Sequence, residues 1–374
     1  MRILHVIPSL QLGGAEKLCL EICKELSKRP GIEIRLAILD NIIEHDISSV
    51  NFPIIFVDSV FIPSILGKSV VKLDGLEKLI EEFKPTVIHS HLFRAEISSR
   101  YHIHQGISYF SHSHDKMHQL KKPSIFGLFN KKKITLAFER NWINKQYVAC
   151  NNHFITISED TYLYIKENIP RSIRNQVYLL PNAVNTSNFQ INNRKFNSKF
   201  PKNLISIGSI IPIKNHLFLL KVVQYLNSIG YEVNLQILGK GSLKDFIEEK
   251  AIEFGIQSKI NIQSTTNLLP HLKIADVYVH SCKLEGFGLV FIEAGSAGLP
   301  IVTLDGKGNR DLIKNGINGF MLEQEDVVNF GNKIMEVLQS EETYSQFSEN
   351  SKKIASGFDI IPYVTKLLEL YLKS

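Results

Sequence analysis

The pattern that most constrains the fold is an alternation of short apolar runs with longer amphipathic stretches, which stops once and then starts again. Such alternation predicts parallel sheets whose strands are joined by crossover helices. Residues 185–202 interrupt it with a polar, asparagine-rich stretch that has no periodicity and is typical of an interdomain linker. A chain of 374 residues is long enough for two domains. The sequence therefore predicts two α/β units of nearly equal size.

The expected strands are short and rich in β-branched residues, and the expected helices are amphipathic. In the first half, strands are predicted at 3–7, 33–39, 54–57, 86–89, 108–111, 154–157 and 177–180. Helices are predicted there at 15–27, 73–83, 93–105 and 159–168. In the second half, strands are predicted at 204–207, 233–238, 260–263, 277–280 and 301–303. Helices are predicted there at 216–228, 243–254, 268–273, 289–297, 326–339, 342–355 and 358–373.

The composition is that of a folded soluble protein, with 44% apolar and 21% charged residues. The longest apolar runs are far shorter than a membrane-spanning helix. The first eight residues end in Pro8 and predict a first strand, not a signal peptide, so we expect a cytoplasmic protein. The four cysteines do not form a disulfide framework. Cys19 and Cys23 are four positions apart on an expected helix, but no further metal ligand is apparent nearby, so packing is the favoured interpretation.

The net charge of +6 is modest and unevenly distributed. Between residues 116 and 145 the basic residues are Lys116, Lys121, Lys122, Lys131, Lys132, Lys133, Arg140 and Lys145. The apolar residues interleaved with them are Phe126, Leu128, Phe129, Leu136, Phe138 and Trp142. This combination suits an anionic membrane surface or a lipid-linked diphosphate, and a solvated helix with one core face explains it equally well. Nucleic acid is disfavoured because no nucleic-acid-binding signature accompanies the charge.

Two carboxylates, Glu285 and Glu293, stand eight positions apart where an expected strand passes into an expected helix. The residues that would open this helix are Gly286, Phe287, Gly288 and Leu289. A helix N-terminus offers unpaired N–H groups and a favourable dipole end to a phosphate. Carboxylates accept hydrogen bonds from vicinal hydroxyls, so the segment suits a nucleotide sugar. The alternative is a solvated helix carrying two surface glutamates.

This stretch resembles the Glu-x7-Glu signature of the retaining GT-B glycosyltransferases of family 4. The resemblance implies two Rossmann-like domains facing across a cleft: an acceptor-binding domain at 1–190, a nucleotide-sugar-binding domain at 191–357, and a terminal helix at 358–374 that returns to the first. It implies that Glu293 holds the ribose hydroxyls and that Glu285, as a catalytic residue, holds the sugar hydroxyls. The resemblance spans nearly the whole chain and is strongest between residues 203 and 320.

A glycine turn and a lysine open the second half, where Gly208 and Ser209 follow a strand and Lys214 precedes the next helix. A lysine there would place an ammonium group near a diphosphate, and we expect Lys214 to bind the donor and act in catalysis. The family pattern has an arginine where this chain has Ser209, which supplies no charge and no bidentate fork. Arg310, in a polar loop after a strand, is our candidate for the missing cation; the alternative is a solvated side chain.

The first expected strand ends in Gly13-Gly14-Ala15-Glu16. By itself this segment is explained equally well as a loop that approaches an anion and as a plain tight turn. It lacks the Gly-x-Gly-x-x-Gly pattern of a hydride-transfer enzyme. Within the resemblance it matches the Gly-Gly-x-Glu loop of family 4, which implies that Gly14 lies near the transferred phosphate and the acceptor.

Histidines cluster at two expected strand ends: His89 and His91 close one, and His112 and His114 close the next. The resemblance implies a catalytic histidine near the donor sugar, a role that falls on His114 with His112 as the alternative. Zinc is disfavoured because no carboxylate or thiol spacing completes a tetrahedral site.

Together these features predict a retaining hexosyltransferase that moves a sugar from a UDP-sugar or GDP-sugar to a saccharide or lipid-linked saccharide. The family-level expectation is bacterial surface polysaccharide synthesis, with peripheral contact at the cytoplasmic face of the inner membrane. The chain has no Asp-x-Asp pair, so no metal or other cofactor is expected, and protein cations must neutralise the diphosphate. Two alternatives stay open: a non-catalytic nucleotide-sugar-binding subunit, which the missing arginine would suit, and another GT-B enzyme such as a sugar-nucleotide epimerase.

Overall fold

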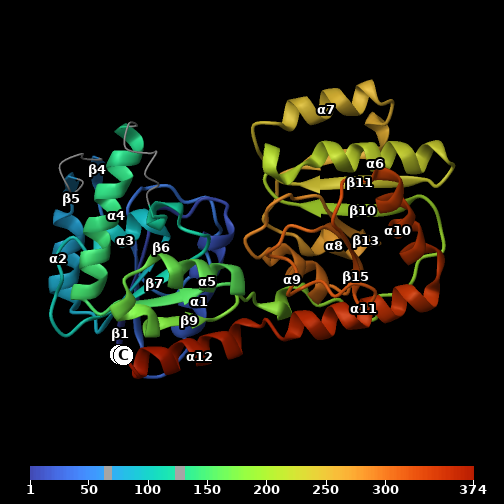
Figure 1. Ribbon diagram of the computed structural model, residues 1–374. Coiled ribbons are helices and arrows are strands. Elements are labelled where there is room, and N and C mark those ends of the chain that lie inside the picture. Colours follow the sequence, from blue (N-terminus) through green and yellow to red (C-terminus); the bar gives the residue numbers. More distant parts are fainter. Residues whose placement is uncertain (63–69, 123–130) are drawn as a thin grey trace. The chain divides into compact units, whose positions relative to one another are not determined.

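The computed structural model describes residues 1–62, 70–122 and 131–374, which form two compact units (Figure 1). Unit 1 comprises Met1–Asn182 and Ile360–Ser374, and unit 2 comprises Ala183–Asp359. The sequence placed these boundaries after residues 190 and 357. Each unit is built around one parallel sheet, as the alternating pattern predicted. Within the described residues, no helix is both long and apolar enough to cross a membrane.

Unit 1 contains a seven-stranded parallel sheet in the order β3-β2-β1-β6-β7-β8-β9. The strands are β1 (Arg2–Ile7), β2 (Glu33–Ile38), β3 (Ile54–Phe56), β6 (Val87–His91), β7 (Ser108–Ser113), β8 (His153–Thr156) and β9 (Val177–Leu179). A separate antiparallel pair, β4 (Val60–Ile62) and β5 (Val70–Lys72), was not predicted. The strand order reverses between β1 and β6, and open α/β sheets bind ligands at such reversal points.

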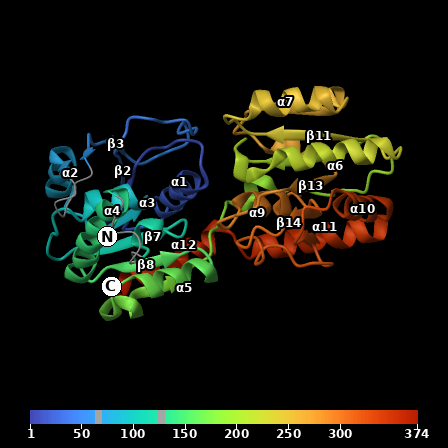
Figure 2. The same cartoon turned by 45° about the horizontal axis from the view of Figure 1, so that its top comes forward.

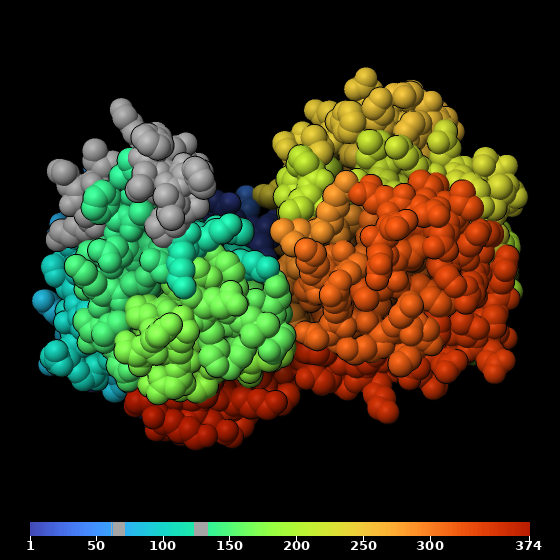
Figure 3. Space-filling view, viewed as in Figure 1, coloured from blue at the N-terminus to red at the C-terminus, as the bar shows by residue number. Residues whose placement is uncertain are grey.

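Helices cover both faces of the unit 1 sheet (Figure 2). They are α1 (Gly14–Leu26), α2 (Asp74–Phe83), α3 (Leu92–Ser99), α4 (Lys131–Ala149), α5 (Glu159–Asn168) and α12 (Ile360–Leu372). Alternation along β1 sends Leu4 and Val6 into the core under α2 and α3, and His5 to the opposite face. There α1 packs against α12. Figure 3 shows α12, in dark red, lying against the green surface of the same unit.

Helix α3 ends at Ser99, six residues before the predicted end at residue 105, because Arg100 leaves the helical conformation. Its guanidinium group is fully buried and donates hydrogen bonds to Asn152 Oδ1 (2.6 and 2.9 Å), Ser90 Oγ (2.9 Å) and Ser111 Oγ (3.0 Å). These partners lie far along the chain, so the helical periodicity could not reveal them.

The basic segment forms helix α4 over its second part, while residues 123–130 lie outside the described residues. Phe138 is 43% exposed, whereas Ile143 and Tyr147 are buried in the core of unit 1. Arg140 donates hydrogen bonds to the carbonyl oxygens of Leu120 (2.7 Å) and Asn168 (3.0 Å). One of the segment's cations is therefore used to hold α4 in place.

Unit 2 contains a six-stranded parallel sheet in the order β12-β11-β10-β13-β14-β15. The strands are β10 (Lys202–Ile207), β11 (Val233–Leu238), β12 (Ile260–Gln263), β13 (Val277–His280), β14 (Ile301–Leu304) and β15 (Gly319–Leu322). The helices are α6 (His216–Ser228), α7 (Lys244–Glu253), α8 (Leu269–Ile274), α9 (Leu289–Ser296), α10 (Val327–Gln339) and α11 (Glu341–Ser356). Only β15 was not predicted among these elements. The order reverses between β10 and β13.

The stretch predicted as an interdomain linker, residues 185–202, belongs to unit 2, and that prediction was wrong. Arg194 fixes it, because its guanidinium group donates hydrogen bonds to the carbonyl oxygens of Ala297 (2.6 Å), Ala275 (2.6 Å) and Leu272. The last residue, Lys202, already belongs to β10. A polar stretch without periodicity can thus be ordered by hydrogen bonds to carbonyl groups at the ends of helices.

Candidate active site

The two loops at the reversal point of unit 2 carry most of the residues predicted to bind the donor. One loop follows β10 and spans residues 208–215, and the other follows β13 and spans residues 281–288. Because β10 and β13 are adjacent and parallel, both loops emerge at the same edge of the sheet. Ser281 ties them together, since its hydroxyl donates to the carbonyl oxygens of Lys214 (2.8 Å) and Asn215 (3.0 Å).

At the centre of the site Lys214 meets Glu285. The Lys214 ammonium donates to Glu285 Oε2 at 2.6 Å, and His280 Nε2 lies 3.1 Å from the same oxygen. The two charged side chains keep 20% and 12% of their surface exposed. Lys214 and Glu285, which were both predicted to contact the donor, therefore form an ion pair between the two loops.

Burial alone would favour the neutral acid, but His280 and Lys214 outweigh it and lower the pKa of Glu285 to about 2. Burial opposes the charge on Lys214 as well, yet the Glu285 carboxylate holds the pKa of Lys214 above its usual value. Burial lowers the pKa of His280 despite its contact with Glu285. At neutral pH the site holds a carboxylate, an ammonium group and a neutral imidazole that donates to the carboxylate.

The segment 286–289 leads into α9, which begins at Leu289. Gly288 precedes the helix with φ of 87°, and a Cβ there would lie 2.5 Å from the Phe291 ring. A glycine is therefore needed for the chain to turn into the helix. The first amides of a helix have no acceptor within it, so the segment offers N–H groups to an anion beside Lys214. Gly286 is exposed, whereas Phe287 is buried.

Glu293 lies inside α9 and is 1% exposed. It is close enough to Tyr278 for both Glu285 and Glu293 to add to the effect of burial in raising the pKa of that phenol. The two glutamates of the signature thus surround one buried tyrosine, whose hydroxyl also lies 3.0 Å from His280 Nδ1. Both carboxylates therefore lie within electrostatic reach of Tyr278; their roles toward sugar and ribose stay predictions.

A third loop, residues 305–310, packs directly on Glu285. The Glu285 amide donates to the Gly306 carbonyl (2.8 Å), and the Gly308 amide donates to the Glu285 carbonyl (3.2 Å). A Cβ on Gly308 would lie 2.2 Å from that carbonyl oxygen, so only glycine permits the approach. Gly306, Gly308 and His280 were not singled out from the sequence. The rule that drew attention to the strand-end histidines of the first half would have found His280 at the end of β13.

The candidate for the missing cation, Arg310, is bound within its own loop. Its guanidinium group pairs with both carboxylate oxygens of Asp305 at 2.5–3.1 Å and is 59% exposed. This pair holds the pKa of Asp305 below its usual value. Ser209 is exposed, and a Cβ on Gly208 would contact the Lys214 side chain at 3.7 Å. Of the two cations predicted to bind the donor, Lys214 is therefore the one that contacts the carboxylate of Glu285.

In unit 1 the predicted residues lie at the reversal point between β1 and β6. Gly14 is exposed and begins α1, and a Cβ on Gly13 would lie 2.2 Å from Glu16 Oε2, so Glu16 folds back over the turn. His114 follows β7, with its Nε2 atom 3.0 Å from His91 Nδ1.

His112 and His114 belong to a stack of five imidazoles that also includes His5, His89 and His91. Burial lowers the pKa of His114 to about 3 and holds that of His112 well below its usual value. His112 and His114 are therefore neutral at neutral pH. One expectation from the sequence was wrong here: Cys19 and Cys23 do have a further potential ligand beside them, His5.

Two family models cover most of the chain. Glycosyltransferase Family 4 matches residues 12–188, and Glycosyl transferases group 1 matches residues 188–354. The chain belongs to glycosyltransferase family 4. The UDP-Gal:α-D-GlcNAc-diphosphoundecaprenol α-1,3-galactosyltransferase of Escherichia coli is 26% identical to it over 332 residues, 83% of each chain. The capsular polysaccharide biosynthesis glycosyltransferase CapM of Staphylococcus aureus is 26% identical over 224 residues, 56% of this chain and 58% of CapM.

Solved structures show that this glycosyltransferase has the predicted GT-B fold. Anabaena Alr3699/HepE in complex with UDP superimposes with a TM-score of 0.78 and 16% identity, covering 100% of both chains. WaaG, a glycosyltransferase involved in lipopolysaccharide biosynthesis, gives a TM-score of 0.71 and 16% identity, covering 99% of both.

Proposed function

We propose that this glycosyltransferase transfers a hexose from a UDP-sugar or GDP-sugar to a lipid-linked saccharide with retention of anomeric configuration, in bacterial surface polysaccharide synthesis. The observation that carries the proposal is the ion pair of Lys214 and Glu285 at 2.6 Å, next to the N-terminus of α9. An anion seated on the α9 amides would meet the Lys214 ammonium, and hydroxyl groups of the attached sugar would meet Glu285.

In the proposed mechanism Glu285 is an ionised hydrogen-bond acceptor for sugar hydroxyls. Lys214 and His280 both hold its Oε2 atom, an arrangement that suits a fixed acceptor better than an attacking nucleophile. Lys214 and the amides of residues 286–289 would stabilise the charge that develops on the departing diphosphate, an effect that grows in the transition state. Departure and attack on the same face of the sugar would then retain its configuration.

The remaining donor contacts complete the proposal. Glu293 would accept hydrogen bonds from the ribose hydroxyls, and Gly208 with Ser209 would bring backbone close to the diphosphate. Arg310 would turn from Asp305 to the donor, and His114, with Gly14, would approach the transferred sugar and its phosphate. Because these protein cations and amides neutralise the diphosphate, we propose transfer without a metal cofactor.

The acceptor class rests on two supports: the curated E. coli relative is named for a diphosphoundecaprenol acceptor, and this chain has a basic, aromatic segment. Exposed Phe138 of α4 lies in that segment. We propose that α4 contacts the cytoplasmic face of the membrane where the acceptor lies. No observation in either unit favours an epimerase.

The test is a transfer assay with UDP-sugars and GDP-sugars and a polyprenyl-diphosphate saccharide, with the anomeric configuration of the product read by NMR. Glu285→Gln removes the charge and keeps the shape, so we expect turnover to fall by about 10²–10³-fold. Glu249→Gln, an exposed glutamate on α7 of the same unit, is the matched control and should leave turnover unchanged. Unchanged turnover in Glu285→Gln would reject the site; donor binding without transfer to any acceptor would favour a non-catalytic binding subunit.

A further inference from the structure

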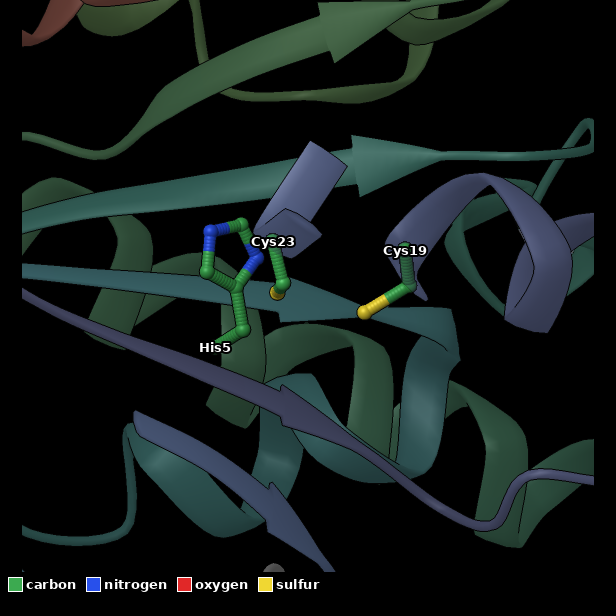
Figure 4. Close-up of side chains that lie close together, drawn as sticks. All are labelled: His5, Cys19 and Cys23. Carbon is green, nitrogen blue, oxygen red and sulfur yellow. The ribbon is translucent and has the colours of Figure 1, made fainter. Parts of the chain in front are cut away.

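Two cysteines and a histidine meet in the interior of unit 1, and the proposed transfer reaction uses none of them. Cys19 and Cys23 lie one turn apart on the face of α1 that covers the sheet, and His5 points toward them from β1 (Figure 4). All three residues have 0% of their surface exposed.

The geometry of the cluster is that of a metal site. Its three potential ligand atoms, two sulfurs and one imidazole nitrogen, all lie within 4.8 Å of one another. A zinc ion with bonds of about 2.3 Å to sulfur and about 2.0 Å to nitrogen sets its ligand atoms roughly 3.5 Å apart. Small side-chain rotations would therefore bring the three atoms onto one ion. A ring nitrogen of His5 already faces Cys23 (Figure 4).

Two histidines of the neighbouring strand β6 contact the ring of His5. Its Nδ1 atom lies 2.9 Å from His91 Nε2, and it stacks on His89, whose Nδ1 atom lies 2.5 Å from the Tyr371 hydroxyl of α12. These contacts fix the orientation of the His5 ring, and the ring nitrogen that faces Cys23 is Nδ1 (Figure 4).

The charges of the cluster favour a cation. Two thiols and one imidazole share a fully buried cluster, and metal binding would release the protons of both thiols. A thiolate in a fully buried site needs a neutralising charge, and a divalent ion would balance two thiolates.

We propose that His5, Cys19 and Cys23 bind a thiophilic metal ion, Zn²⁺ or Cu⁺, that ties α1 to β1 in unit 1. Two thiolates and an imidazole are ligands that both ions accept. The three residues would suffice for Cu⁺, whereas Zn²⁺ would need a fourth ligand. All three residues belong to unit 1, whereas the Lys214–Glu285 pair belongs to unit 2.

The test uses the full chain, dialysed against a chelator under a non-chelating reductant and titrated with Co²⁺ as a spectroscopic probe. We expect one equivalent to give thiolate-to-Co²⁺ charge-transfer absorption, which one equivalent of Zn²⁺ abolishes. A separate titration with Cu⁺ against a competing chelator distinguishes the two ions by affinity. Binding should also raise the melting temperature, since the ion binds the folded state.

Cys19→Ser combined with Cys23→Ser should abolish the absorption, and Cys150→Ser, a partly buried cysteine of the same unit, should retain it. If the double variant fails to fold by circular dichroism, His5→Phe keeps both thiols and should weaken Co²⁺ binding roughly tenfold or more. The proposal is overturned if Co²⁺ gives no thiolate absorption. It is also overturned if the absorption survives the double variant but is lost in Cys282→Ser, which would place the ion with His280 and Glu285 of unit 2.

Discussion

The sheets of the two units reverse their strand order at equivalent places, between β1 and β6 in unit 1 and between β10 and β13 in unit 2, but the side chains there differ. In unit 2 the reversal point holds a charged, partly exposed pair, Lys214 and Glu285. In unit 1 it holds fully buried imidazoles, including His89 and His91, whose pKa values burial keeps well below the usual value.

The difference shows what topology does and does not determine. Parallel strands that diverge at a reversal point leave a place for a ligand, whatever residues line it. The side chains decide the ligand: an ammonium group beside helix amides suits a diphosphate, whereas buried neutral imidazoles and thiols suit a metal ion. The predictions below test whether the charged pair Lys214–Glu285 of unit 2 and the buried histidines of unit 1 differ in solution in ligand binding and in response to pH.

The largest expected effect comes from removing the charge of Lys214. Lys214→Met should lower turnover by about 10²–10³-fold, because the departing diphosphate loses its cation and Glu285 is left without its ion-pair partner. Lys273→Met, an exposed lysine on α8 of the same unit, should leave turnover unchanged. Steady-state transfer rates of the two variants provide the measurement, and equal rates for both would show that the pair of unit 2 does not serve the donor.

Acidification should weaken unit 1 before unit 2. The pKa of His114 is lowered from its usual 6.5 to about 3, so its neutral state stabilises the fold above pH 6.5 and this stability is lost as the pH falls below it. Unit 2 holds two histidines whose pKa burial lowers, His216 to about 4 and His280, against four in the stack of unit 1, so it should lose less stability over the same range. The pKa of Glu285 is lowered from its usual 4.5 to about 2, so its contribution is lost only below pH 4.5. Each histidine whose pKa is lowered in this way should reduce the free energy of unfolding by about 1.4 kcal/mol per pH unit below 6.5.

Hydrogen exchange of each unit between pH 7 and pH 4 measures this order. Unit 1 should lose protection first, and His114→Gln should reduce the pH dependence, whereas replacing the exposed His102 by glutamine should not. Loss of protection in unit 2 first, or in both units at the same pH, would contradict the assignment of neutral imidazoles to unit 1.

A smaller effect is expected from the loop that supports Glu285. Gly308→Ala should lower turnover about tenfold, because the added Cβ would lie 2.2 Å from the Glu285 carbonyl oxygen and displace the loop. Gly357→Ala is the control, since its Cβ would meet its nearest atom at 3.3 Å. Kinetics of both variants test this; if Gly308→Ala kept full activity, the position of Glu285 would not depend on that loop.

The smallest effect concerns Arg310. Because its guanidinium group is exposed and paired with Asp305, Arg310→Ala should leave the free energy of unfolding nearly unchanged. As a secondary donor contact it should weaken donor binding only several-fold, well below the effect of Lys214→Met. Calorimetry with UDP measures donor binding, and chemical denaturation measures the free energy of unfolding. A loss of binding as large as that of Lys214→Met would make Arg310 the principal cation.

The sequence predicted what local patterns determine and failed where distant residues decide. All strands of the two large sheets except β15 followed from short apolar runs, and the charged donor residues followed from motifs whose spacing is local. The linker prediction failed because Arg194 finds its partners in α8 and at the ends of α8 and α9, 78 to 103 residues away. The cluster of His5 with Cys19 and Cys23 was missed because no spacing rule relates a residue of a strand to one face of the helix that packs on it.

The central claim is that the reversal point of unit 2, and not that of unit 1, receives the nucleotide diphosphate. Hydrogen exchange of the full chain with and without saturating UDP or GDP measures this directly. We predict that one of the two nucleotides protects the amides of residues 286–293 and 208–216, and that Lys214→Met removes this protection. Protection confined to unit 1, or unchanged protection in Lys214→Met, would contradict the account.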